Sequence, residues 1–185
     1  VSQQAEDATR SLDVITQEIK RLDRVVRNFL NFNRPVDVKL KKDDIQPVLQ
    51  EVVALAQREA HQHNVQILLH SGDNLPPIQL DPDLMKQCLL NIVLNGCQAM
   101  PKGGSLNIST ALHNGSLELR VQDEGVGIPP ESREKVFNLY YTTKENGSGI
   151  GLATVFKVVQ LHNGEIEIDS DVGKGTTFTL KFPVA

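Results

Sequence analysis

The stretch DEGVGIPPE, from Asp123 to Glu131, is followed along the chain by NGSGIGLATV, from Asn146 to Val155. Glycines let a backbone approach a bound group closely, and two such clusters near each other usually mean a backbone held near phosphate. Neither cluster fits a P-loop, which needs GxxxxGK[ST] between a strand and a helix. Neither fits a dinucleotide fingerprint, which needs GxGxxG directly after a strand. The glycines therefore need another explanation.

Asp123 lies at the end of a predicted strand, directly before Gly125 and Gly127. A carboxylate only accepts hydrogen bonds, so Asp123 suits the exocyclic amine of adenine and would repel the carbonyl of guanine. The alternative is an ordinary turn at a strand end, where Asp and Gly are common. Taken alone, this motif favours the turn.

Gly147, Gly149 and Gly151 open a predicted helix. The free N–H groups at such a helix N-terminus attract an anion. A flexible helix start is the alternative. The motif alone indicates a phosphate site only moderately.

A third motif, NIVLNGCQAM, lies on a predicted helix. Gln87, Asn91, Asn95 and Gln98 recur at spacings of four, four and three, so they form one polar stripe. An amide oxygen is a suitable hard ligand for Mg²⁺ beside phosphates and water. A solvated helix face explains the stripe equally well.

Between the glycine clusters lies KVFNLYYTTKENG, residues 135–147. Lys135 and Lys144 could neutralise phosphate charge. Phe137 and the apolar residues after it must pack somewhere, although polar residues flank them. An ordered apolar patch inside a loop is typical of a lid that closes over a ligand.

The remaining pattern predicts an α+β fold. Residues 1–35 predict one amphipathic helix with an apolar stripe, ended by Pro35. The predicted strands are Val36–Leu40, Val65–Ser71, Ile78–Leu80, two strands within 103–123 that turn at Asn114-Gly115, and a pair within 165–184. The predicted helices run from an N-cap at Asp43 or Asp44 to about His61, from an N-cap at Asp81 to about Met100, and from Gly149 to about His162. We expect a two-layer α/β sandwich with three helices on one face of a mixed sheet of about five strands.

Composition narrows the function. The chain has 185 residues, 39% of them hydrophobic, and a net charge of −4. No basic patch stands out, so we expect no nucleic-acid partner. Cys88 and Cys97 have no CxxC partner, so we interpret them as core residues. Two free thiols indicate a reducing, cytoplasmic compartment. No apolar run is long enough to span a membrane, but the sequence lacks an initiator Met, so the parent protein could still be anchored in the inner membrane.

Five motifs occur in a fixed order: Asn91 with Asn95, Asp123-x-Gly125-x-Gly127, Phe137, Gly147-x-Gly149-x-Gly151, and Gly173-x-Gly175-Thr176. In this combination the chain closely resembles the ATP-binding domain shared by histidine kinases, gyrase, Hsp90 and MutL. The resemblance covers about Val36 to Ala185. NIVLNGCQAMPKGG, YYTTKENGSGIGLATV and GKGTTFTLKFP are most similar to the nitrogen-regulation type of bacterial sensor histidine kinase.

The stretch EIKRLDRVVRNFLNFNRP is similar to the second helix of the kinase dimerisation hairpin. The resemblance thus divides the chain into residues 1–35, an incomplete dimerisation and phosphoacceptor hairpin, and residues 36–185, the ATP-binding catalytic domain. It implies a homodimer through the hairpin. It also implies transfer of the ATP γ-phosphate to a His on the hairpin, and from there to an Asp on a response-regulator receiver domain.

The resemblance also implies roles for individual residues. Asn95 would hold Mg²⁺, Asp123 would read adenine, and Thr176 would assist it at the base. Asn91, Lys144 and Lys135 would act on the phosphates. The full set implied to contact ATP is Asn91, Asn95, Asp123, Gly125, Gly127, Ile128, Tyr141, Thr142, Thr143, Lys144, Gly147, Ser148, Gly149, Ile150, Gly151, Leu152 and Thr176.

Gyrase-like and Hsp90-like relatives carry a Glu at the position of Asn91. A neutral amide cannot act as a general base, so Asn91 favours transfer to an external nucleophile over hydrolysis. The chain departs from the kinase pattern in two ways. It lacks the phosphoacceptor box, a His followed by an acid and a proline, and it has Gly96 where the family usually has Ala. An ATP-responsive regulatory module without phosphotransfer is therefore the alternative to a kinase.

Overall fold

The computed structural model describes residues 37–72, 74–144 and 147–184. It also describes eight positions near the N-terminus, namely Leu12, Ile15, Thr16, Glu18, Ile19, Leu22, Asp23 and Val26. All eight are helical, and the five apolar ones among them are each more than half exposed. Most of the helix predicted for residues 1–35 lies outside the described residues, as does the predicted domain boundary after residue 35. That division stays a prediction.

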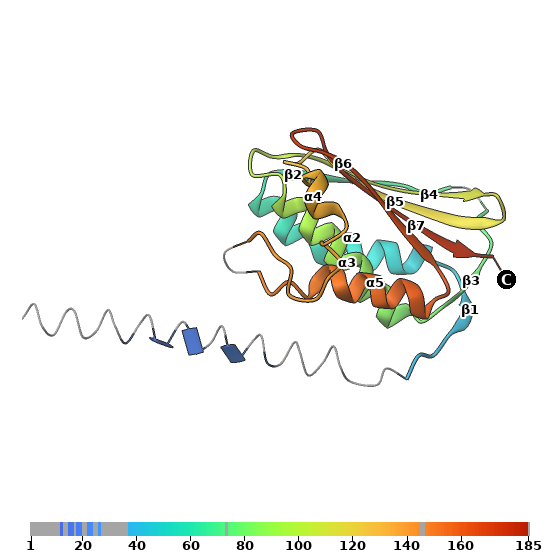
Figure 1. Ribbon diagram of the computed structural model, residues 1–185. Coiled ribbons are helices and arrows are strands. Elements are labelled where there is room, and N and C mark those ends of the chain that lie inside the picture. The colour runs from blue at the N-terminus through green and yellow to red at the C-terminus, as the bar shows by residue number, and fades with distance from the viewer. Residues whose placement is uncertain are drawn as a thin grey trace, which may run out of the picture.

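One layer of the fold is a five-stranded mixed sheet (Figure 1). The strands lie in the order β2 (Val65–His70), β4 (Gly104–His113), β5 (Ser116–Asp123), β7 (Gly175–Pro183) and β6 (Glu165–Asp171). β2 and β4 are parallel, and every other neighbouring pair is antiparallel. A separate two-stranded sheet pairs β1 (Lys41–Asp43) with β3 (Ile78–Leu80).

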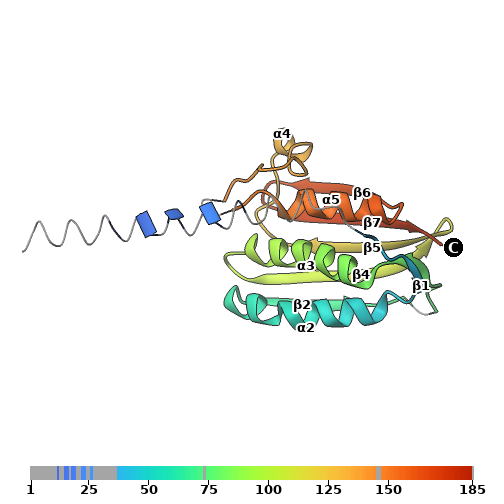
Figure 2. The ribbon, with the colours of Figure 1, turned by 90° about the horizontal axis from the view of Figure 1, so that it is seen from below.

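The other layer consists of three helices on one face of the sheet (Figures 1 and 2). They are α2 (Gln46–Gln62), α3 (Pro82–Gln98) and α5 (Gly151–Leu161). A fourth, short helix, α4 (Pro130–Arg133), interrupts the long loop between β5 and α5. The predicted α+β two-layer sandwich is confirmed. In the described part of the chain, no helix combines the length and the apolar character needed to cross a membrane.

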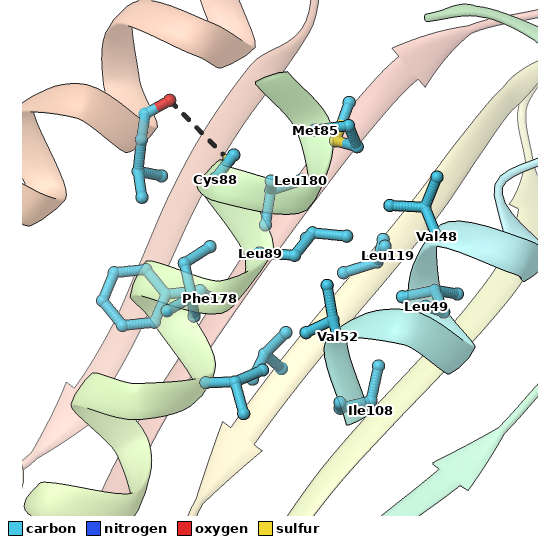
Figure 3. Packing of buried hydrophobic residues seen from close by; sticks show 14 of the residues in the cluster. Val48, Leu49, Val52, Met85, Cys88, Leu89, Ile108, Leu119, Phe178 and Leu180 are labelled. Atoms are coloured by element: carbon cyan, nitrogen blue, oxygen red, sulfur yellow. Dashed lines mark hydrogen bonds between the residues drawn. The ribbon is translucent and has the colours of Figure 1, made fainter. Parts of the chain in front are cut away.

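The core lies between these layers. Side chains of α2, α3, β4, β5 and β7 point toward one another in Figure 3, where Val52, Leu89 and Leu119 meet. Cys88 and Cys97 are fully buried on α3, as predicted. Burial raises the pKa of the Cys88 thiol to about 12 and that of Cys97 to about 11, so both stay protonated at neutral pH.

Two predicted boundaries near the start of the domain are wrong. Residues 37–40 of the predicted strand Val36–Leu40 form no strand; β1 begins at Lys41. The backbone N–H of Lys39 instead donates to the Asp81 carboxylate at 2.9 Å, so a side chain takes the hydrogen bond that a neighbouring strand would have supplied. α2 begins at Gln46 and its N-cap residue is Ile45, so the predicted N-cap at Asp43 or Asp44 lies one or two residues too early. The Asp44 carboxylate accepts from the Gln46 N–H at 2.9 Å and so supports the helix from one residue outside it.

The predicted N-cap of α3 is confirmed. The Asp81 carboxylate accepts from the N–H groups of Asp83 and Leu84, each at 3.2 Å. Burial opposes its ionisation, but these donors and the N–H of Lys39 lower the pKa of Asp81 below its usual value. This cap fixes the first residue of α3, and therefore the position of each later residue along the helix.

His162 follows α5 and is buried, although the sequence marks it only as a residue at a helix end. Its Nε2 accepts from the Asp81 N–H at 2.9 Å, and its Nδ1 lies 2.7 Å from the Val158 carbonyl oxygen. Because a carbonyl only accepts, the proton is on Nδ1. The ring thus ties the end of α5 to the start of α3.

Replacing His162 with Ala should therefore destabilise the fold. The change leaves the buried Asp81 N–H without its acceptor and removes a buried ring, which together should cost about 2–4 kcal/mol of unfolding free energy. Urea denaturation followed by circular dichroism measures this loss. His113→Ala, at the exposed end of β4, is the matched control and should change stability by less than about 0.5 kcal/mol. Equal losses in the two variants would refute the proposed tie.

Candidate functional site

A cleft of about 500 Å³ opens between α3, α5, the loop after β5 and residues 141–144 and 147–149. Fifteen of the predicted site residues line it: Asn91, Asn95, Asp123, Gly127, Ile128, Tyr141, Thr142, Thr143, Lys144, Gly147, Ser148, Gly149, Gly151, Leu152 and Thr176. Gly125, Ile150 and Lys135 do not line it. Gly125 and Ile150 are buried beside the cleft, whereas the Lys135 side chain is exposed.

Asp123 is the buried acid of the cleft, with 5% of its surface exposed. Its Oδ1 accepts from the N–H of Gly125 at 2.9 Å and from the N–H of Thr176 at 3.2 Å. Burial raises the pKa of Asp123, and the two N–H donors only partly offset this effect. Since Oδ1 is occupied by these two donors, Oδ2 is the oxygen that can accept a hydrogen bond from a ligand.

Two glycines allow this geometry. Gly127 has a φ of +72°, and a Cβ there would overlap the Asp171 carbonyl. Gly175 has a φ of +99°, and a Cβ there would overlap the Asp123 carbonyl. Residues with a side chain rarely adopt such angles and would have no space here. Gly127 therefore lets the loop after β5 approach the end of β6, and Gly175 lets the start of β7 approach the end of β5 at Asp123.

The polar stripe on α3 is split between solvent and cleft. Gln87 is exposed and lies outside the cleft, whereas Asn91 and Asn95 are half-buried and line it. The Asn91 amide donates to the Gly151 carbonyl at 3.4 Å, a long hydrogen bond that links α3 to the first residue of α5. The sequence correctly indicated one face, but not where along α3 that face becomes covered.

Lys144 comes from the opposite side of the cleft and reaches the same stripe. Its Nζ donates to Asn95 Oδ1 at 2.9 Å and to Gln98 Oε1 at 2.6 Å. Burial lowers the pKa of Lys144, and the charge of the nearby Glu59 opposes that shift. Glu59 also accepts from the Gln98 amide at 2.7 Å, so Gln98 stands between the lysine and the carboxylate.

The N-terminus of α5 also faces this end of the cleft. Its N-cap residue is Ile150, whose side chain accepts no hydrogen bond, so the N-cap residue leaves the first-turn N–H groups unpaired. α5 begins at Gly151, two residues later than predicted, because Gly149 has a φ of +65° and accepts from the Tyr140 N–H at 2.9 Å. The start of α5 lies beside the amides of Asn91 and Asn95.

Phe137 and Tyr141 of the intervening loop are packed, whereas Tyr140 is 46% exposed. The Phe137 ring lies 5.8 Å from that of Phe156 and 6.4 Å from that of Phe178. The Tyr141 hydroxyl donates to Ser132 Oγ at 2.7 Å. These contacts fix the N-terminal flank of the segment that carries Thr142, Thr143 and Lys144. Residues 145 and 146 lie outside the described part.

Several lining residues were not singled out from the sequence as site residues, among them Leu94, Ala99, Val126 and Ser132. Gly96 was noted only for its departure from the family pattern. A Cβ on Gly96 would lie 2.5 Å from Leu106 Cδ1 and 3.7 Å from Asp123 Oδ2. Leu106 is fully buried, so the missing methyl group leaves room for this leucine. Such residues become recognisable only when α3 is packed on β4 and β5.

The two ends of the cleft thus differ in chemistry. The Asp123 end offers acceptor oxygens, suited to an amine on a flat group. The α5 end offers a lysine, amide groups and free N–H groups, suited to an anion and its counter-ion. Within the described residues no group of three or more His, Cys, Asp or Glu side chains is placed to hold a metal alone. Any metal here would have to share its ligands with a bound anion and water.

Comparison with known proteins agrees with this geometry. A family model described as "Histidine kinase-, DNA gyrase B-, and HSP90-like ATPase" matches residues 80–185. The sensor histidine kinase ZraS of Escherichia coli K12 is 35% identical over 178 residues, which are 96% of this chain and 38% of ZraS. The chain therefore spans well under half the length of this relative.

Solved structures share the fold. Full-length ShkA in complex with AMPPNP aligns with a TM-score of 0.80 and 26% identity, over 95% of this chain and 39% of ShkA. The histidine kinase ThkA, solved in complex with the response regulator TrrA, aligns with a TM-score of 0.74 over 93% of this chain and 50% of that one. At 23% identity the second match supports the fold alone.

The burial of Asp123 predicts an unusual pH dependence of stability. A carboxyl whose folded-state pKa is raised disfavours folding when ionised, so its penalty is present above that pKa and disappears as the pH falls through it. Asp123→Asn keeps an oxygen for the Gly125 and Thr176 N–H groups. We expect this variant to be at least as stable as the parent at pH 7, by up to about 1 kcal/mol. Its advantage should shrink on acidification.

Asp81→Asn is the opposing control. The pKa of Asp81 is lowered, so its contribution is present at neutral pH and is lost as the pH falls through the folded-state value. Thermal denaturation between pH 3 and pH 7 measures both effects. As the pH rises to 7, the stability of Asp123→Asn should rise above that of the parent and the stability of Asp81→Asn should fall below it. A large loss of stability in Asp123→Asn at pH 7 would contradict the assignment.

Proposed function

The chain belongs to the histidine kinase-, DNA gyrase B- and HSP90-like ATPase family, and we propose that its cleft binds ATP with adenine at Asp123 and the phosphates at the start of α5. The observation that carries the proposal is Asp123, buried at one end of the cleft with one oxygen fixed by two backbone N–H groups and the other free. A 6-amino group can donate to that oxygen, whereas a 6-carbonyl is repelled by it.

The other end of the cleft supports the proposed phosphate site. Free N–H groups at the N-terminus of a helix longer than two turns attract phosphate oxygens. Lys144 lies on the same side and would exchange the amide oxygens of Asn95 and Gln98 for phosphate oxygens. In this assignment, Gly147, Ser148, Gly149 and Gly151 supply the backbone around the phosphates. Lys135 is exposed outside the cleft, and its proposed catalytic role depends on movement of its segment.

We propose that Asn95 holds Mg²⁺. The residues present fit this ion: Asn95 Oδ1 already accepts from an ammonium group at 2.9 Å, so it is an oxygen that faces positive charge. With one amide oxygen from the protein, the ion would take its other ligands from phosphate and water, as Mg²⁺ commonly does. When bound, it neutralises phosphate charge. Lys144 must leave Asn95 when the ion arrives.

Asn91 decides between hydrolysis and transfer. Its amide donates to the Gly151 carbonyl and cannot remove a proton from water. The chain's own residues therefore bind, orient and neutralise the phosphates, and no described side chain of the cleft is placed as a general base for water. An external nucleophile suits this arrangement better than hydrolysis.

The parent protein, on this proposal, is a two-component sensor histidine kinase, and the motif NIVLNGCQAMPKGG suggests the nitrogen-regulation type. An imidazole nitrogen on the dimerisation hairpin would attack the γ-phosphorus, ADP would leave, and the phosphoryl group would pass to an aspartate of a response regulator. ZraS is named a sensor histidine kinase, which supports the proposal. The exposed apolar positions Leu12, Ile15, Ile19, Leu22 and Val26 support pairing of the helix in a homodimer.

Calorimetric titration with ATP, GTP and a non-hydrolysable ATP analogue in Mg²⁺ tests the binding site. We expect ATP to bind and GTP not to bind. Asp123→Asn should lower ATP affinity at least about 100-fold, because an amide N–H would face the donor amine. If ATP and GTP bind alike, the orientation of the base is wrong. If ATP binds but no phosphate reaches a supplied hairpin that contains the acceptor His, a regulatory module replaces the kinase.

The metal assignment is tested on α3. Asn95→Ala should lower the affinity for ATP with Mg²⁺ by about 10-fold or more while changing metal-free ATP binding little, because only the ion loses a ligand. Gln87→Ala is the control, since Gln87 belongs to the same stripe but is exposed outside the cleft. A Mg²⁺ dependence that is unchanged in Asn95→Ala would remove Asn95 from the metal site.

A further inference from the structure

Ser170 on β6 has no place in the proposed chemistry, yet it is 2% exposed and lies directly behind the adenine end of the cleft. Its Oγ is within hydrogen-bond distance of three groups, which belong to two other segments of the chain. The N–H of Ile128 lies at 2.8 Å, the carbonyl oxygen of Gly175 at 3.0 Å, and the hydroxyl of Thr176 at 2.9 Å. The residue therefore joins the loop after β5 to the start of β7.

The hydrogen-bonding capacity of Ser170 limits how these contacts are shared. A serine hydroxyl has one proton to donate and two lone pairs that accept. The Ile128 N–H can only donate, so it takes one lone pair. The Gly175 carbonyl can only accept, so it takes the proton. What remains for Thr176 is the second lone pair, and the Thr176 hydroxyl must donate to it.

This assignment fixes what Thr176 shows to the cleft. Thr176 lines the cleft, and because its single proton is directed at Ser170, its hydroxyl can offer only lone pairs to a ligand there. Asp123 Oδ2 beside it also only accepts. The adenine end of the cleft thus presents two acceptor oxygens from neighbouring strands. The Thr176 oxygen acts only as an acceptor there as long as the Thr176 hydroxyl donates its proton to Ser170.

We propose that Ser170 is a specificity-determining residue, which orients the Thr176 hydroxyl as an acceptor and so favours a 6-aminopurine over a 6-oxopurine. The inference rests on the proposed function, in which this end of the cleft holds the base of ATP. Ser170 acts through Thr176 and is therefore a positioning residue. The amine of adenine can donate directly to the acceptor pair, whereas the 6-carbonyl of hypoxanthine or guanine only accepts and cannot.

ATP and ITP are the probes, because their bases differ in the amine or carbonyl at position 6 and in the matching proton at N1. Their dissociation constants are measured by calorimetry for the parent chain, Ser170→Ala, Thr176→Val and the double variant. In Ser170→Ala the Thr176 proton is free to turn toward a 6-carbonyl. The preference for ATP over ITP should therefore fall by about three- to tenfold.

The double variant separates orientation from a merely structural effect. With no hydroxyl at position 176, Ser170→Ala should leave the ATP-to-ITP ratio unchanged. Thr110→Val is the control for loss of a buried hydroxyl elsewhere. Thr110 is buried on β4, away from the cleft, and its Oγ1 accepts from the Gly72 N–H. This control should leave the ratio as in the parent.

A Ser170→Ala variant that weakens ATP and ITP equally would overturn the inference, because Ser170 would then only hold the Ile128 loop. The proposed function fails separately, when the parent chain binds neither nucleotide. Should Ser170→Ala not fold, position 176 gives the same test. Thr176→Ser keeps the donor to Ser170 and should keep the preference, whereas Thr176→Val should lose ATP affinity by about three- to tenfold with ITP unchanged. Identical ratios in these two variants would refute the inference.

Discussion

One buried carboxylate oxygen connects the two chain segments that form the adenine end of the cleft. Asp123 ends β5, and its Oδ1 accepts from Gly125 two residues later and from Thr176 on β7. The antiparallel register pairs Asp123 with Thr176, so a slip of one residue would turn Thr176 away from the acid. Everything proposed for the base, including the part of Ser170, depends on that register.

The cleft combines two environments that are both unfavourable without a ligand. Asp123 bears its charge in a buried place, and Lys144 bears an opposite charge among neutral amide oxygens. Both groups lose solvation that protein contacts only partly replace. A nucleotide bound as proposed would offer each of them a better partner, so binding would relieve unfavourable interactions at the same time as it forms new ones.

Much of this arrangement is readable from the sequence. Helix and strand periodicity place the glycine clusters, Asp123 and the Asn91–Asn95 pair on particular elements, but their assignment to one site came from the resemblance of their order along the chain to a known ATP-binding domain. The start of β1 and of α2 could not, since side chains of Asp81 and Asp44 take backbone hydrogen bonds that propensity does not anticipate. Ser170 and His162 were missed for a related reason. Each looks ordinary in its own segment, and its partners are supplied by distant parts of the chain.

Gly96 and Leu106 constrain each other's identity through packing. A methyl group on residue 96 would lie 2.5 Å from the end of the buried Leu106 side chain, so alanine at 96 and leucine at 106 are mutually unfavourable in this backbone. The two positions are therefore epistatic. Alanine at position 96 is tolerated best with a smaller or reoriented residue at 106, so the order in which the two positions change determines how stable the intermediate is.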